Sequence, residues 1–394
     1  MKETTLYLHI GTPKTGTTAI QEYLGEHKDY LESKGFCYPE LRQINAPLIR
    51  NAHFLAYRDF NLDLEKENWN KLAELSQRFD NIILSDEVVF YSGGQSPYFW
   101  ERVVKKCKEL HFNLKVIVYF RRQDEYMLSF YEQIIKIRKS KSFTYHDTAY
   151  IEPFFEHELD YYTYTQRIIS FIGKENVIVR PYERAQFYDN NPSIVYDFAH
   201  IIGLTDFPPA SNTFTNDSIS DCVLEIKRFL NMVPDFRKVQ TVPSNCKMPL
   251  LETQEQLKKD GRIKKRTGAT PATRNHLLNK YKKSNYKLAK EILGRPDGIL
   301  FLDTEVNKGD EKNIIPRKDM EYAYSVFLQH IPDHPECGYT VEEMEDICKQ
   351  AMKAFDNYVP RTFLRDQYHI LKRLIEVKKF KADRLNSYKN TFTQ

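Results

Sequence analysis

The residues best suited to chemistry lie near the start of this 394-residue chain, where residues 8–20 read LHIGTPKTGTTAI. Gly11 and Gly16 bracket a short loop that carries Lys14 in its middle. Glycines let the backbone curve so that successive amides converge on one oxyanion, and a following helix adds its positive end. In the usual ATP-binding loop a lysine directly follows the second glycine, whereas here Thr17 stands there. The loop therefore predicts an anion cradle in which Lys14 reaches a bridging oxygen or the reacting group itself.

A second anion-binding element follows the buried strand pattern within VIVYFRRQDEYMLSFYEQ (Val116–Gln133). Arg121 stands at the end of the strand, and Ser129 follows eight residues later inside a helical pattern. A guanidinium fork together with a hydroxyl suits a terminal phosphate monoester. Arg122 is the competing arginine, and the spacing to the serine favours Arg121.

The segment TPKTGTT at residues 12–18 resembles the 5′-phosphosulfate loop of sulfotransferases that use 3′-phosphoadenosine 5′-phosphosulfate. The resemblance implies that Lys14 contacts the phosphosulfate and stabilises the leaving phosphate. It also implies that the 5′-phosphate is held by loop amides and hydroxyls from Thr15, Gly16, Thr17 and Thr18. Arg121 and Ser129 match the family's 3′-phosphate motif in type and separation. The likeness is closest to bacterial and carbohydrate-type members and covers residues 4 to 303 approximately.

The reaction that this resemblance implies needs a base for the acceptor's proton. In the family the base is a histidine or a glutamate placed between the first helix and the following strands. His53 lies in that segment, and a histidine side chain ordinarily has a pKa of about 6.5. Glu87 lies just past the strand pattern of residues 81–85, where ligand crevices form in open α/β sheets. His53 is the first candidate base and Glu87 the second, whereas His9 is expected to pack in the core.

A basic stretch lies at Leu257–Arg266, where six cationic residues stand against Asp260. Proteins of this family often close a basic loop over the 3′-phosphate, so the candidate contacts are Arg262, Lys264, Lys265 and Arg266. A solvated run of charge explains the stretch equally well, and attraction of an acidic polysaccharide is a further alternative. We expect a loop here.

Short apolar runs rich in β-branched and aromatic residues alternate with helical patterns over the first half of the chain. The expected strands are Thr5–Ile10, Asn81–Ser85, Leu114–Phe120 and Asn176–Tyr182. The expected helices are Thr17–Ser33, Asp124–Lys139, Leu159–Ile172 and Pro192–Ile202. Such alternation predicts an α/β fold with a central parallel sheet between two helical layers. The resemblance implies the phosphate-loop NTPase-like version of this architecture.

Beyond residue 216 the strand signals fade and helical patterns take over. The expected helices are about 271–293, Lys318–His330, Val341–Tyr358 and Arg361–Lys381. We therefore expect a sulfotransferase domain over residues 1–304 and a helical C-terminal extension over residues 305–394.

Composition limits the class of protein. The formal net charge of +4 is too small to predict nucleic-acid binding. Six cysteines are scattered without a metal-binding or disulfide pattern, so we expect free thiols. The sequence has no signal-peptide pattern and no apolar run of about 20 residues. These features predict a soluble, cytoplasmic protein.

The resemblance, together with these patterns, implies a bacterial sulfotransferase that needs no metal and moves a sulfuryl group to a hydroxyl or amine, with a saccharide as the leading acceptor. The first alternative is a phosphate-loop nucleotide kinase or ATPase, in which Asp86 would hold magnesium after its strand. The second is a non-catalytic module that binds nucleic acid through the basic stretch and the lysine-rich tail. Aromatic residues are not interleaved with those cations as such binding would favour. The acceptor's identity and the oligomeric state stay open.

Overall fold

The computed structural model describes residues 3–56, 61–137, 156–209, 219–230, 246–262, 271–304, 306 and 315–356. The chain divides into two compact units, each built from separate stretches of sequence. The first contains Met1–Ser129, Ile151–Asn216 and Ala272–Asn307; the second contains Phe130–Tyr150, Asp217–Pro271 and Lys308–Gln394. The division expected at residue 304 lies near one of these boundaries, but the stretch Asp217–Pro271 groups with the later residues. That residues 1–304 form a sulfotransferase domain stays a prediction.

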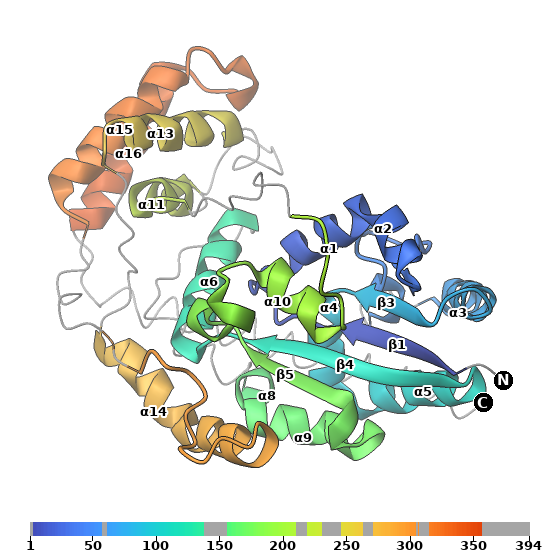
Figure 1. Cartoon of the computed structure of the whole chain (residues 1–394). Helices are drawn as coiled ribbons and strands as arrows, with labels where there is room; N and C mark the ends of the chain where they lie inside the picture. The colour runs from blue at the N-terminus through green and yellow to red at the C-terminus, as the bar shows by residue number, and fades with distance from the viewer. Residues whose placement is uncertain are drawn as a thin grey trace. The chain divides into compact units, whose positions relative to one another are not determined.

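The first unit is built on a five-stranded parallel sheet with the order β2–β3–β1–β4–β5 (Figure 1). The strands are β1 (Thr4–His9), β2 (Phe36–Cys37), β3 (Asn81–Ser85), β4 (Phe112–Phe120) and β5 (Val177–Pro181). The four expected strands are confirmed to within two residues at each end. The short strand β2 was not expected, because two residues carry no periodic pattern. The prediction of an α/β fold with a central parallel sheet is confirmed.

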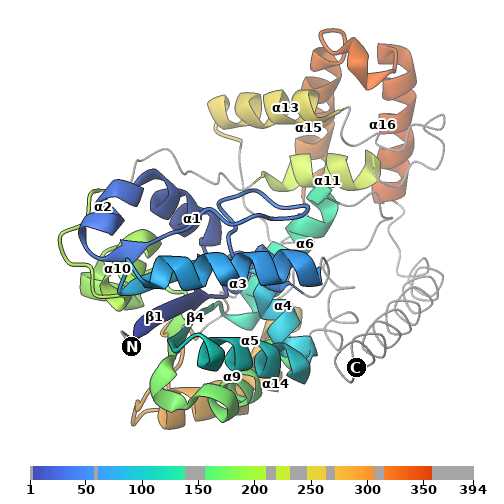
Figure 2. The same cartoon turned by 90° about the vertical axis from the view of Figure 1, so that its right-hand side faces the viewer.

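Helices cover both faces of the sheet because successive side chains of a strand point to opposite faces. On β1, Leu6 and Leu8 belong to one hydrophobic cluster and Tyr7 belongs to another. The Leu6 cluster includes side chains from α3 (Leu62–Ser76), α4 (Val88–Gln95), α5 (Pro97–Glu109) and α9 (Tyr161–Ile172). The Tyr7 cluster includes side chains from α1 (Thr17–Glu26), α2 (Lys28–Ser33) and α10 (Ile194–Ile201). The first unit therefore has three layers, and Figure 2 shows β1 between α1 and α2 on one side and α5 and α9 on the other.

Several helices differ from the expected boundaries. The expected helix Thr17–Ser33 is two helices that meet at His27, whose φ and ψ of −113° and 35° are not helical. The expected helix at about 271–293 is α14 (Pro271–Lys287) followed by a π-helical turn at Leu288–Ile292. Helices α3, α4 and α5 were not expected from the sequence. The helix expected at Asp124–Lys139 is α6 (Gln123–Ile137), and Glu156–Leu159 forms a short helix, α8, before α9.

Strand order determines where the loops of the first unit meet. The chain passes from β3 to β4 across the intervening β1, so the direction of strand addition reverses beside β1. Because the strands are parallel, the carboxyl ends of these three strands lie at the same edge of the sheet. Ligands of open α/β sheets bind at such an edge, outside the point of reversal. The segments that follow His9, Ser85 and Phe120 start there, and each carries candidate site residues.

The described part of the second unit is helical, with α11 (Asp221–Leu230), α13 (Lys247–Lys259), α15 (Arg317–His330) and α16 (Val341–Asp356). Its core includes Ile226 of α11, Leu250 of α13 and Phe327 of α15. The expected loop at Leu257–Arg266 is wrong at its start, because α13 continues to Lys259. Arg266 and the helix expected at Arg361–Lys381 lie outside the described residues.

All six cysteines are buried and none forms a disulfide, as expected. Within the residues that the structure describes, no helix is both long enough and apolar enough to cross a membrane.

Candidate functional site

The loop after β1 has a left-handed backbone at three positions. The φ angles are 89° at Gly11, 69° at Lys14 and 74° at Gly16. Glycine adopts such angles freely, whereas a lysine does so at a cost that is typical of functional sites. The loop is tied to β4, because the Thr12 amide donates to the Tyr119 carbonyl at 2.9 Å and the Tyr119 amide donates to the Gly11 carbonyl at 2.7 Å. The sheet thus positions the start of the loop.

The loop ends in a set of amides that have no protein acceptor. The Ile20 amide donates to the Gly16 carbonyl at 3.2 Å as the first regular bond of α1. The amides of residues 14–19 donate no hydrogen bond to any other residue in the described part of the chain. Unpaired amides at a helix N-terminus carry partial positive charge and attract phosphate or sulfate groups. The loop therefore has the donors that an anion cradle needs.

The threonines of the loop differ in what they can offer a ligand. Thr15 is buried, and its hydroxyl donates to the Thr12 carbonyl at 2.5 Å. That hydrogen bond holds the shape of the loop, and the expected contact of the Thr15 hydroxyl with a phosphate stays a prediction. Thr17 is also buried, whereas Thr18 and the Lys14 side chain are exposed.

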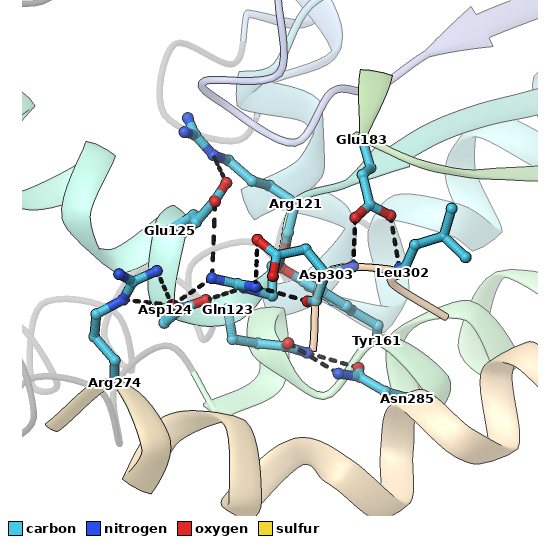
Figure 3. A network of polar contacts seen from close by, with 11 residues as sticks. Arg121, Gln123, Asp124, Glu125, Tyr161, Glu183, Arg274, Asn285, Leu302 and Asp303 are labelled. Atoms are coloured by element: carbon cyan, nitrogen blue, oxygen red, sulfur yellow. Dashed lines mark hydrogen bonds and ion pairs between the residues drawn. The ribbon is translucent and has the colours of Figure 1, made fainter. Parts of the chain in front are cut away.

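Arg121 connects the loop to the second anion-binding element. Its Nη1 donates to Ser129 Oγ at 2.6 Å and to the Lys14 carbonyl at 3.2 Å. Arg121 and Ser129, which the sequence places together through their eight-residue spacing in one motif, are therefore in direct contact, and their grip on a phosphate stays a prediction. The hydroxyl of Tyr161 donates to the Arg121 carbonyl at 2.5 Å and holds the end of β4 from below (Figure 3).

The competing arginine has a structural role. Arg122 is 5% exposed and pairs with Asp124, with 2.7 Å between Nε and Oδ1. Arg274 of α14 pairs with Asp124 from the opposite direction, also at 2.7 Å. Beside them, the amides of Gln123 and Asn285 exchange hydrogen bonds at 2.8 and 3.0 Å (Figure 3). This network holds the start of α6, and it leaves Arg121 as the arginine that faces the loop.

A cavity of about 280 Å³ lies beside Arg121. Its wall combines aromatic and charged side chains: Arg121, Arg122, Glu125, Tyr182, Glu183, Arg184, Phe187, Phe301 and Asp303. Glu183 holds the wall that carries Phe301, because its carboxylate accepts hydrogen bonds from the Leu302 and Asp303 amides at 2.8 and 2.7 Å. The cavity thus has apolar surface for a flat ring next to both arginine and carboxylate side chains.

His53 is held by a carboxylate at the end of β3. Its Nδ1 lies 2.7 Å from Asp86 Oδ2, and the residue is 5% exposed. Asp86 is fully buried and also accepts from Arg50 Nη2 at 2.6 Å and from the Val88 amide at 2.7 Å. A carboxylate on Nδ1 holds the ring in the tautomer whose Nε2 carries the lone pair. The contact with Asp86 therefore favours the tautomer of His53 that a general base uses.

Glu87 lies against the loop. A Cβ built on Gly11 would lie 3.0 Å from Glu87 Cβ, so the two backbones are in close contact. The Glu87 carboxylate lies 3.7 Å from Arg50 and accepts from Gln21 of α1 at 3.5 Å. Both candidate bases therefore belong to one cluster around Arg50 and Asp86.

His9 packs in the core, as expected. Its Nδ1 lies 2.8 Å from Ser85 Oγ, and its ring contacts Tyr119 and Phe198. Burial lowers the pKa of His9 to about 3, and the charge of Asp86 offsets part of that effect. His9 therefore stays neutral and supports the strands beneath the loop.

The structure brings most of the predicted site residues to one edge of the sheet. Lys14 contacts Arg121 through its carbonyl, and Glu87 lies beside Gly11. Sequence reasoning missed Arg50, whose role depends on a contact with a residue 36 positions away. It also missed the cavity, whose lining residues come from three separate segments. Asp86 was noted only as a metal ligand of the alternative enzyme class.

Comparison with known proteins assigns neither a family nor an activity. No model of a known protein family matches the chain. An uncharacterised protein of Archaeoglobus fulgidus is 26% identical over 219 residues, which are 55% of this chain and 56% of that protein. The chain therefore spans about half the length of this relative. No solved structure matches.

Proposed function

We propose that this chain is a sulfotransferase that moves a sulfuryl group from 3′-phosphoadenosine 5′-phosphosulfate to a hydroxyl or amine acceptor. The observation that carries the proposal is the bond from Arg121 to both Ser129 and the Lys14 carbonyl. It joins two separate anion-binding elements, as a nucleotide with phosphates at both ends of its ribose requires. We also propose that the fold is of the phosphate-loop NTPase type and that the protein is bacterial.

In this proposal the loop holds the 5′ end of the donor. The unpaired amides of residues 14–19 bind the 5′-phosphate at the N-terminus of α1. The Lys14 ammonium balances the negative charge that builds on the phosphate as sulfur departs. Cationic and amide donors of the chain supply this stabilisation.

The other end of the donor lies at Arg121 and Ser129, which grip the 3′-phosphate. The adjoining cavity then receives the nucleoside, because Tyr182, Phe187 and Phe301 give it apolar walls. Arg266, which lies outside the described residues, is retained as a further contact to the 3′-phosphate.

The acceptor side of the reaction is assigned to the cluster around Asp86. The acceptor oxygen attacks sulfur in line, a new S–O bond forms, and the bond from sulfur to the 5′-phosphate oxygen breaks. His53 Nε2 takes the acceptor's proton while Asp86 stabilises the imidazolium. Glu87 is the alternative base. A saccharide remains the leading acceptor on the strength of the resemblance.

A phosphate-loop kinase or ATPase is the alternative function. It would use Asp86 to hold magnesium at the end of β3. Both oxygens of that carboxylate already accept hydrogen bonds, from Arg50, His53 and the Val88 amide. This occupancy favours the sulfotransferase.

Calorimetric titration of the purified chain tests the proposal with adenosine 3′,5′-bisphosphate, with adenosine 5′-phosphate and with magnesium ATP. We expect the bisphosphate to bind most tightly, and Arg121→Gln to remove its advantage over the 5′-phosphate. A sulfate-transfer assay with a panel of mono- and oligosaccharides then identifies the acceptor. If magnesium ATP instead binds most tightly and is turned over, the sulfotransferase proposal is wrong and the chain is a kinase or ATPase.

A further inference from the structure

Arg121 already pairs with a carboxylate of the chain, that of Glu125, at the place where the 3′-phosphate of the nucleotide is proposed to bind. Its Nε donates to Glu125 Oε2 at 3.2 Å (Figure 3), and its Nη1 is taken by Ser129 and the Lys14 carbonyl. Arginine grips a phosphate best through two parallel N–H donors. Such a grip beside Ser129 needs Nε together with Nη2, and Glu125 occupies Nε.

The position of Glu125 allows its carboxylate to move away from Arg121. It stands on the first turn of α6 with Ser129 one turn later, so both side chains reach Arg121 from the same face of the helix. The Glu125 side chain is 37% exposed. Its second oxygen, Oε1, lies 3.9 Å from Arg122 Nη2, which offers the carboxylate another cation. Arg122 itself is buried and fixed by Asp124, so this second partner does not move.

We propose that Glu125 is a displaceable internal anion that competes with a phosphate monoester for Arg121 and thereby sets how tightly the nucleotide's 3′-phosphate is held. The inference rests on the proposed function for the identity of the nucleotide, but the competition concerns any phosphate monoester. A phosphate monoester carries almost two negative charges at neutral pH, so it outcompetes a single carboxylate. When the phosphate arrives, Glu125 moves toward Arg122. When the carboxylate returns, it helps to expel the bisphosphate product.

Glu125→Gln tests the competition because it keeps the side chain's shape and removes its charge. Titration with adenosine 3′,5′-bisphosphate should show binding that is tighter by about two- to fivefold, the range for a partly exposed ion pair. Adenosine 5′-phosphate does not reach Arg121 through a second phosphate, so its affinity should be unchanged. Glu101→Gln, at an exposed position on α5, makes the same change in net charge and should alter neither affinity. Stopped-flow measurements should assign the gain to slower dissociation.

Glu125→Gln should also be measured in a protein that carries Arg121→Gln. Without Arg121, Glu125→Gln should no longer improve bisphosphate binding, because the two residues act through one contact. An equal gain with and without Arg121 would mean general electrostatics and would overturn the inference. Unchanged or weaker bisphosphate binding by Glu125→Gln alone would also overturn it.

Inorganic phosphate separates this inference from the proposed function. We expect phosphate to protect the Glu125→Gln protein against thermal unfolding at a lower concentration than it protects the wild-type protein. If this holds but neither protein binds the bisphosphate, the inference stands and the nucleotide assignment fails. If both ligands bind and Glu125→Gln gains nothing for either, the nucleotide assignment stands and the inference fails.

Discussion

Asp86 Oδ2 lies 2.7 Å from His53 Nδ1, and this contact connects the end of β3 to a segment that enters no strand or long helix. The His53 segment is a single 3₁₀ turn, so its position depends on contacts with other segments, among them the bond from the Ala52 amide to the Ser85 carbonyl at 3.5 Å. The Arg50 guanidinium binds the same carboxylate. Asp86 therefore organises the proposed proton-transfer site.

Replacement of His53 by glutamine should abolish sulfuryl transfer and leave the affinity for adenosine 3′,5′-bisphosphate unchanged. The reason is that a general base acts on the acceptor and does not touch the nucleotide. Glu87→Gln serves as the matched test of the other candidate base and should retain most of the turnover. If Glu87→Gln is the inactive variant and His53→Gln the active one, the roles are reversed.

Replacement of Asp86 by asparagine should lower the free energy of unfolding by about 3 kcal/mol, because it leaves Arg50 without its buried counter-charge. Denaturant titration of the purified variant measures this loss. Asp206→Asn, which removes an exposed carboxylate paired with Lys34, should lower the free energy of unfolding far less, because solvent screens that pair. Similar losses for the two variants would show that the Asp86 contacts do not stabilise the fold.

Replacement of Lys14 by methionine should reduce turnover by about tenfold or more, because a cation at the reacting group acts mainly in the transition state. Methionine keeps the unbranched apolar stem and removes the charge. Bisphosphate affinity should change less than turnover does. Turnover within about threefold of the wild-type value would contradict the role assigned to Lys14.

Replacement of Gly11 by alanine should distort the anion loop, because the new Cβ meets Glu87 Cβ at 3.0 Å and the Pro13 nitrogen at 3.1 Å. Gly203 is the matched control: its φ is 88° against 89° for Gly11, and nothing lies within 4 Å of an added Cβ. Both alanine variants should lose about 1–2 kcal/mol of stability for the left-handed backbone. Only Gly11→Ala should lose more than that and also lose bisphosphate binding. Equal behaviour of the two variants would show that the loop has room for a side chain.

His334 in the second unit should make stability depend on pH. Its ring nitrogens lie 2.9 Å from Glu252 and 2.8 Å from Glu336, and these hydrogen bonds raise the pKa of His334. A raised pKa in the folded state stabilises the protein fully below the unfolded value of about 6.5, and the gain disappears as pH rises through the folded pKa. His334→Gln should therefore be less stable than wild type at pH 6 and nearly equal to it well above the folded pKa. A difference that stays constant with pH would exclude this linkage.

The sequence alone determined the elements whose signal is local. Residues 81–85 were predicted as a strand with the boundaries that β3 has, because a buried parallel strand reads as one apolar run. The glycine loop and the positions of Arg121 at a strand end and Ser129 in the next helix were also predicted, since both depend on spacing along one strand–helix connection. Helix α3 was missed, and so was β2, which exists through its pairing with β3.

Only the tertiary structure decided how distant segments meet. The strand order brings the ends of β1, β3 and β4 together, and this places Glu87 against Gly11. Neither the bond from Arg50 to Asp86 nor the grouping of Asp217–Pro271 with the later helices has a periodic pattern in the sequence. Such contacts depend on side-chain packing between segments far apart along the chain, and hydrophobic periodicity reports only which face of each segment is buried.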